Sequence, residues 1–98
     1  MNENEFRMTL ETPKMLREGL IERFREAYRS KGWSRSELAR RSRVPASTIG
    51  KFEKEGTISF RQLVDLAFAL GAQDPLMELF RMEEKMTLEE LKRSKGLK

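Results

Sequence analysis

The chain has 98 residues and contains neither cysteine nor histidine. That length supports one small hydrophobic core, but not an enclosed active-site cleft as well. The missing residue types exclude disulfides, thiolate and histidine acid–base chemistry, and zinc sites built on those ligands. With 20 Lys or Arg against 16 Asp or Glu the net charge is +4, which is compatible with a nucleic-acid partner.

The sequence predicts no enzyme, no cofactor and no membrane segment. The adjacent acids Glu83–Glu84 and Glu89–Glu90 cannot share a site, because neighbours in a helix point in different directions. No glycine-rich phosphate loop occurs. No apolar run reaches the roughly 18 residues of a transmembrane helix, and the first residues lack the order of a signal peptide. We therefore expect a non-catalytic, cytoplasmic protein.

Residues 1–11 form an N-terminal extension. Phe6, Met8 and Leu10 alternate with polar residues, and this period of two predicts a short strand. Such a strand would need a pairing partner from a second copy of the chain. The alternative for this segment is a frayed polar tail.

A first helix is predicted from Pro13 to about residue 30. Thr12 is a suitable N-cap, and Gly32 is expected to end the helix. The apolar positions at helical spacing are Leu16, Leu20, Ile21, Phe24, Ala27 and Tyr28. Because Gly19 costs about 1 kcal/mol relative to alanine, we expect either separate helices before and after it or a close neighbour at this glycine. Trp33 is interpreted as a core residue rather than one that stacks on a base.

The next stretch predicts two short helices joined by a tight turn. Ser34 is a good N-cap and Glu37 completes a reciprocal S-x-x-E capping box, so the first of these helices begins near Arg35. It is expected to end near Ser42, because the residue that precedes Pro45 is disfavoured in the α conformation.

Pro45 opens the second helix of this pair, where its missing N–H loses no hydrogen bond. Ile49 and Phe52, three residues apart, give this helix a narrow inward stripe. A small Ala39 and a branched Val44 suit two helices that cross at a steep angle. These features predict a helix-turn-helix, whose second helix lies in the DNA major groove.

The positive charge of the chain is concentrated on this pair of helices. Between Ser34 and Lys54 two glutamates face six basic residues, which leaves a local net charge of +4. The basic residues are Arg35, Arg40, Arg41, Arg43, Lys51 and Lys54. The rest of the chain is neutral overall, so this concentration favours DNA as the partner.

The stretch S-R-S-E-L-A-R-R-S-R-V-P-A-S-T-I-G-K-F-E resembles the Cro/C1-type (XRE) helix-turn-helix family, whose usual pattern is S-Q-x-E-L-A-x-x-x-G-V-S-x-x-T-I-S-x-x-E. The matching positions are Ser34, Glu37, Leu38, Ala39, Val44, Thr48, Ile49 and Glu53. Two positions depart from the pattern. Arg35 replaces a Gln that usually contacts a phosphate. Arg43 replaces the turn Gly and must adopt a left-handed backbone, at a cost of about 1 kcal/mol.

The resemblance, together with side-chain chemistry, implies roles for the residues of this pair. The expected base-reading residues are Ala46, Ser47, Thr48, Gly50 and Lys51. The expected phosphate contacts are Arg35, Arg40, Arg43 and Lys54. Lys51 can donate to guanine, Ser47 can serve several bases, and Ala46 can contact a thymine methyl. Thr48 has an alternative role within its own helix, and the bare positions 46 and 50 favour readout of DNA shape.

A fourth helix is predicted from residue 60 to residue 70. Gly56 ends the preceding helix, Ile58 is expected to point inward, Ser59 caps the fourth helix and Gly71 ends it. Its sequence, F-R-Q-L-V-D-L-A-F-A-L, is apolar almost all round. We therefore expect this helix to be buried on more than one side, as part of the core or of an interface.

A fifth, short helix is expected to begin at Asp74–Pro75. The residues expected to pack back from it on the core are Leu76, Leu79 and Phe80. Residues 81–98 form a basic C-terminal tail, in which Thr87 and Glu90 make a capping box for a possible helix over 88–93. The last residues of this tail either add phosphate contacts or only improve solubility.

Together these elements predict an all-α fold: a five-helix Cro/C1-type (lambda repressor-like) helix-turn-helix domain over residues 12–80, between two short extensions. The implied function is a sequence-specific transcriptional repressor. Because one such module buries little DNA surface, we expect a homodimer on double-stranded DNA with a palindromic operator.

A narrower resemblance concerns the second half of the chain. The strings F-E-K-E-G-T-I-S-F, L-M-E-L-F and T-L-E-E-L-K-R are similar to HipB-like antitoxins, which accompany HipA-type kinases. This resemblance implies an antitoxin that represses its own promoter and binds a kinase toxin. The alternatives are a phage or chromosomal repressor without a toxin partner, and a helix-turn-helix module that binds protein instead of DNA.

Overall fold

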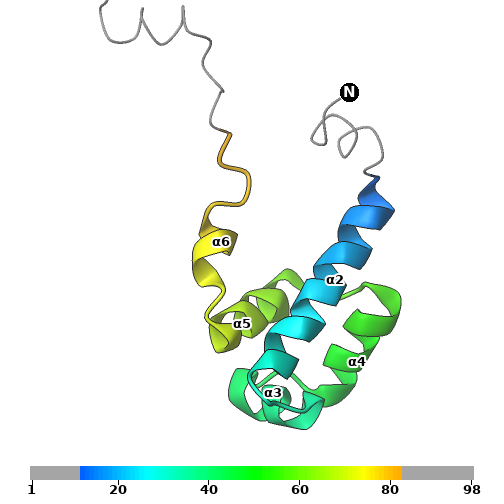
Figure 1. The fold of residues 1–98 in the computed structure, drawn as a ribbon, viewed down its shortest axis with the longest axis vertical. Coiled ribbons are helices and arrows are strands. Elements are labelled where there is room, and N and C mark those ends of the chain that lie inside the picture. The colour runs from blue at the N-terminus through cyan, green and yellow to red at the C-terminus, as the bar shows by residue number, and fades with distance from the viewer. Residues whose placement is uncertain (1–11, 83–98) are drawn as a thin grey trace, which may run out of the picture.

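A computed structural model of the protein describes residues 12–82. Within these residues the structure contains five helices and no strand, which confirms the predicted all-α fold. The helices are α2 (Pro13–Ser30), α3 (Arg35–Ser42), α4 (Ala46–Glu55), α5 (Phe60–Leu70) and α6 (Gln73–Met77). Helix α2 runs diagonally across the domain, with α3 at its C-terminal end, α4 on one side and α5 on the other (Figure 1). The possible strand in residues 1–11 and the possible helix over 88–93 lie outside the described residues.

Local capping chemistry sets most of the helix boundaries. The Thr12 and Ser59 hydroxyls each accept the backbone N–H three residues later, at 3.1 Å. Gly56 and Gly71 adopt left-handed backbones at the ends of α4 and α5, as predicted. Helix α6 begins at Gln73, one residue earlier than predicted, without a side-chain cap. No helix in residues 12–82 is both long enough and apolar enough to cross a membrane.

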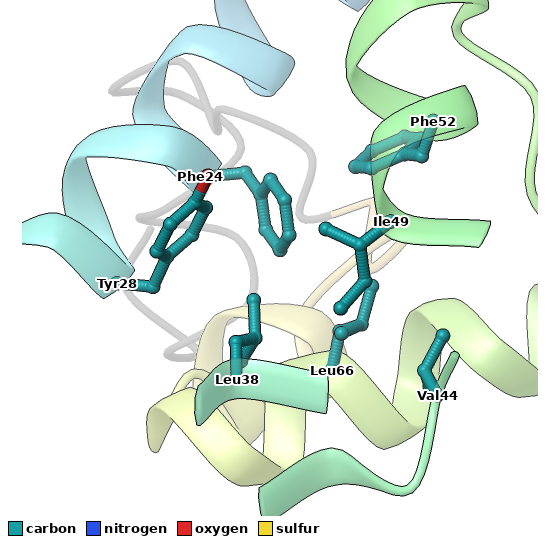
Figure 2. Packing of buried hydrophobic residues seen from close by; sticks show 7 residues of the cluster. All are labelled: Phe24, Tyr28, Leu38, Val44, Ile49, Phe52 and Leu66. Atoms are coloured by element: carbon teal, nitrogen blue, oxygen red, sulfur yellow. The ribbon is translucent and has the colours of Figure 1, made fainter. Parts of the chain in front are cut away.

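The core gathers residues from α2, α3, α4 and α5 and from the turn between α3 and α4 (Figure 2). Its buried side chains are Phe24, Tyr28, Leu38, Val44, Ile49, Phe52 and Leu66. The Phe24 ring packs edge-on against Tyr28 and Phe52, with centroids 5.4 and 5.1 Å apart. Burying an aliphatic or aromatic side chain of this size stabilises the fold by about 1.5–3 kcal/mol. Trp33 packs against this core and is partly buried, which confirms its interpretation as a core residue.

The apolar side chains of three predicted helices are covered less than their sequence patterns indicate. In α2 only the C-terminal half is covered, and Leu16 is 61% exposed because the first turns project beyond the neighbouring helices. In α5, Leu66 is buried in the core as expected, whereas Phe60 and Phe68 are exposed on another side, where burial in an interface stays a prediction. Phe80, expected to pack back, is 85% exposed where the backbone turns through a positive φ of 69°. Leu79 is exposed as well.

Helix α2 passes through Gly19 without a break. A Cβ atom added at Gly19 would meet Arg23 of the same helix, whose Nη1 would lie 3.2 Å away. The expectation of two helices is therefore wrong, and the close neighbour is a flexible side chain rather than another element.

Gly19→Ala is expected to raise the free energy of unfolding by about 0.5–1 kcal/mol, because alanine restricts the unfolded chain and favours the helix. Urea unfolding followed by circular dichroism measures the change. Gly32→Ala is the matched control of opposite sign: Gly32 has a φ of 75°, so alanine there is strained even though no atom obstructs it. An unchanged or lower stability of Gly19→Ala would mean that Arg23 cannot move aside.

Candidate nucleic-acid interface

The turn between α3 and α4 is built from short-range hydrogen bonds. Arg43 adopts the left-handed backbone predicted for it, with φ 63° and ψ 18°, and its N–H donates to the Ala39 carbonyl at 2.8 Å. The buried Ser42 hydroxyl accepts the Val44 N–H at 3.1 Å. This bond provides a local compensation for the strain at Arg43, which the sequence did not reveal.

Helix α4 has a buried side and an exposed side. Ile49 and Phe52 point into the core, as the predicted inward stripe requires. Among the predicted site residues of this helix, Ser47, Lys51 and Lys54 are exposed. The other three, Ala46, Thr48 and Gly50, are half-buried at the edges of the exposed side. The side chains available for contacts in a DNA groove are therefore mainly polar and cationic.

Arg35 of α3 lies over Gly50 of α4. A Cβ atom at Gly50 would meet the Arg35 guanidinium, with Nη1 at 3.7 Å and Cζ at 3.8 Å. Gly50 is thus half-buried in part because the Arg35 guanidinium covers it. The structure brings a predicted phosphate contact and a predicted base-reading position together.

Glu53 joins α2, α3 and α4. Its Oε2 accepts from Arg25 Nε at 3.2 Å and from Arg35 Nη2 at 2.9 Å, and its Oε1 accepts from the Tyr28 hydroxyl at 2.6 Å. The Glu53 side chain is only 4% exposed, so the carboxylate is almost fully withdrawn from water. The sequence marked Glu53 only as a family match, and its role in holding Arg35 was missed.

The ionisation of this cluster follows from its geometry. Burial acts to raise the pKa of Glu53, but the hydrogen bonds from Arg35, Tyr28 and Arg25 outweigh it and leave the pKa below its ordinary value. Burial raises the pKa of Tyr28, and the bond to Glu53 raises it further. Glu53 is therefore ionised and Tyr28 neutral at neutral pH, which keeps every bond of the cluster in place.

The remaining predicted phosphate contacts differ in their surroundings. Arg40 donates through two nitrogens to Glu37, at 2.9 and 2.6 Å, and Arg41 donates to the same carboxylate at 2.9 Å. Hydrogen bonds from Arg40, and then from Arg41, lower the pKa of Glu37 to about 2. Arg43 and Lys54 have no ion-pair partner within residues 12–82.

The predicted capping box at the start of α3 forms only in part. The Ser34 hydroxyl accepts the Glu37 N–H at 3.1 Å, as expected. The Glu37 carboxylate, however, accepts from Arg40 and Arg41 instead of returning to the Ser34 backbone. Two guanidinium groups within one turn are stronger donors than one amide, which explains the difference.

A polar cleft of about 390 Å³ lies between α4 and the start of α5. It is lined by Lys51 and Thr48 together with three polar side chains that the sequence assigned at most to helix capping. These are Thr57, Ser59 and Gln62. Hydroxyl and amide groups beside a cation are common in contacts with the phosphate backbone. In the sequence, Ser59 and Gln62 at the start of a helix were the features that could have indicated this part of the site.

Two helices locked at a tight turn, the second with a polar and cationic outer side, define a helix-turn-helix domain of the DNA-binding kind. A family model described as Helix-turn-helix matches residues 21–73, which is more than half of the chain. The chain belongs to the Cro/C1-type helix-turn-helix (XRE) family. This family consists of DNA-binding domains of transcription regulators and not of enzymes. Comparison with the curated proteins and with the solved structures gave no match.

Proposed function

We propose that the protein is a sequence-specific repressor that inserts α4 into the DNA major groove. The observation that supports this most directly is the division of α4: apolar residues anchor one side in the core, while Ser47, Lys51 and Lys54 face solvent on the other. The concentration of positive charge on α3 and α4 provides the attraction to the phosphate backbone.

In this proposal the outer side of α4 reads the bases. Lys51 donates to guanine and Ser47 bonds to a base edge. Ala46, Thr48 and Gly50 offer the bases no strong donor of their own, so shape readout contributes to specificity. The phosphate contacts come from Arg35, Arg40, Arg43 and Lys54. Because Glu53 holds Arg35 over Gly50, that cation is already placed before DNA arrives.

The finer role that we propose is that of an autoregulatory antitoxin, which acts as a homodimer on a palindromic operator and binds a HipA-type kinase toxin. It is supported by the similarity of F-E-K-E-G-T-I-S-F and the strings that follow it to HipB-like antitoxins. A kinase-like reading frame next to the gene, and co-purification of its product with the protein, are the expected results. Absence of both would leave a repressor without a toxin.

The test is a mobility shift with the DNA immediately upstream of the gene, at several salt concentrations, against a scrambled duplex of equal length. We expect preferential binding to an inverted repeat, weakening steeply with salt. Equal binding to both duplexes would contradict sequence-specific repression at this promoter. Absence of binding to any duplex at low salt would favour the protein-interaction module.

A further inference from the structure

Gly50 lies in the interior of α4, where the backbone does not require a glycine. Three glycines of the described residues, Gly32, Gly56 and Gly71, have positive φ angles, and Gly50 is not among them. Glycine in a helix interior destabilises the helix relative to alanine, because it loses more conformational freedom on folding. The reason for a glycine at this position therefore lies outside the helix itself.

The space beside Gly50 is occupied by Arg35. The three nearest atoms that a Cβ at position 50 would meet all belong to this arginine: Nη1 at 3.7 Å, Cζ at 3.8 Å and Cδ at 3.9 Å. These are ordinary van der Waals distances for a Cβ, so alanine would fit. A β-branched side chain would not, because its further carbons extend toward the guanidinium and its rotamers are restricted in a helix.

Glu53 fixes the guanidinium that lies over Gly50. Arg35 Nη2 donates to Glu53 Oε2 at 2.9 Å. Glu53 follows Gly50 by three residues, so both are on the same side of α4. The Glu53 side chain is 4% exposed, whereas that of Arg35 is 48% exposed. The carboxylate thus holds one edge of the guanidinium, and other donors of its fork stay accessible.

The cluster keeps an excess of positive charge. Arg25 and Arg35 share the single carboxylate of Glu53. Two guanidinium groups against one carboxylate leave one positive charge that is not neutralised within the cluster. A phosphate oxygen can therefore be attracted to the exposed part of Arg35 without displacing Glu53.

A held arginine binds with a smaller entropic cost than a free one. A long side chain loses rotamer freedom when a partner immobilises it, and this loss weakens binding. In this protein, the packing of Arg35 over Gly50 and its bond to Glu53 restrict the side chain before DNA arrives. A side chain at position 50 that pushed Arg35 away would remove this advantage.

We propose that Gly50 is a positioning residue for Arg35 and not a base-reading residue. It leaves the surface of α4 open for the guanidinium, which Glu53 then holds where it can contact a phosphate. The inference rests on the proposed function for the DNA contact, and it deepens that function by giving Gly50 a part in affinity rather than in specificity.

A double-mutant cycle on the full chain tests this role. Gly50→Val and Gly50→Ala are made alone and together with Arg35→Gln, and each protein is titrated in a mobility shift with the upstream DNA and with the scrambled duplex. Gly50→Val is expected to weaken binding to both duplexes about tenfold, and by less than about twofold once Arg35→Gln is present. Gly50→Ala is the matched control and is expected to bind as the wild type does, because its Cβ fits.

Urea unfolding of the same proteins provides a readout that needs no DNA. Gly50→Val is expected to lower the urea midpoint relative to Gly50→Ala, because valine separates Arg35 from the buried Glu53 carboxylate. In the Arg35→Gln background the difference between valine and alanine should shrink, since no guanidinium remains to be displaced. The lower helix propensity of valine is the same in both backgrounds and cancels. Thermal melts verify that each variant is folded.

Three results would overturn the inference while a wild type that prefers the operator keeps the proposed function. Equal weakening by Gly50→Val with and without Arg35→Gln would mean that valine obstructs the DNA directly. A lost preference for the operator, with unchanged binding to the scrambled duplex, would make position 50 a base-reading position. Additive changes in the urea midpoint would show that valine does not displace Arg35. Conversely, coupled urea midpoints in a protein that binds no duplex would overturn the proposed function and leave Gly50 as the residue that positions Arg35.

Discussion

Glu53→Gln is expected to lower the free energy of unfolding by about 2 kcal/mol. The substitution keeps the shape of the side chain but removes the charge that binds two guanidinium groups and one phenol. Breaking a buried ion pair by changing one partner costs about 3–5 kcal/mol. Arg25 and Arg35 are one third and about one half exposed and can regain water, so we expect a smaller loss.

Urea unfolding of Glu53→Gln and Glu55→Gln provides the measurement and its control. Glu55 lies on the same helix and pairs with Lys51 at 4.0 Å on the exposed side, so its loss should change stability by no more than about 0.5 kcal/mol. Similar stabilities for the two variants would show that the Glu53 cluster contributes no more than a surface pair.

The same cluster predicts a dependence of stability on pH. The pKa of Glu53 in the folded protein lies below its ordinary value of 4.5, so its ionised form stabilises the fold. This contribution is fully present above about pH 4.5 and is lost as the pH falls through the lowered pKa. The difference in unfolding free energy between wild type and Glu53→Gln should therefore narrow below pH 4.5. Glu37 also has a lowered pKa, so the variant keeps part of the acid sensitivity.

The helix boundaries and the turn were predictable because they depend on local chemistry. Ser34 and Ser59 cap helices through bonds to residues three positions away, and Gly56 and Gly71 supply left-handed backbones where a helix must end. The left-handed backbone of Arg43 was predictable from its place in the family pattern. Such features need no knowledge of the tertiary fold.

The Glu53 cluster was not predictable, because it joins residues far apart in the chain. Arg25 lies 28 residues from Glu53, and Arg35 lies 18 residues from it. Many pairings of the arginines with the glutamates fit the sequence equally well. Only the packing of α2, α3 and α4 around the core selects the one observed.

The exposure of particular apolar side chains was the second feature that the sequence could not predict. The composition of α5 predicted an apolar helix, but not which neighbour would cover each side. Leu66 is buried against the core, whereas Phe68, two residues later, faces outward. Helical periodicity places these two residues on different sides of α5, and the short α6 cannot cover the second one.

The double substitution Arg35→Gln with Lys51→Gln is expected to weaken operator binding about 100-fold. Loss of a base contact costs about 1–3 kcal/mol of binding free energy. Loss of a phosphate contact weakens binding further and makes the slope of log affinity against log salt concentration less steep by roughly one unit. Glutamine at position 35 is the residue that the family usually has there, so the helix start remains acceptable. Glu53 keeps its bonds to Arg25 and Tyr28, which limits the loss of stability.

The single variants separate the two roles. Arg35→Gln should weaken binding to operator and scrambled duplex alike, because a phosphate contact has no sequence preference. Lys51→Gln should chiefly reduce the preference for the operator. The control removes the same two charges from α2, in Lys14→Gln with Arg23→Gln, both of which are exposed. If the two double variants bind the operator equally well in a mobility shift, overall charge governs the affinity. Helix α4 would then not be the DNA-reading element, and a protein partner for its exposed side would become the better interpretation.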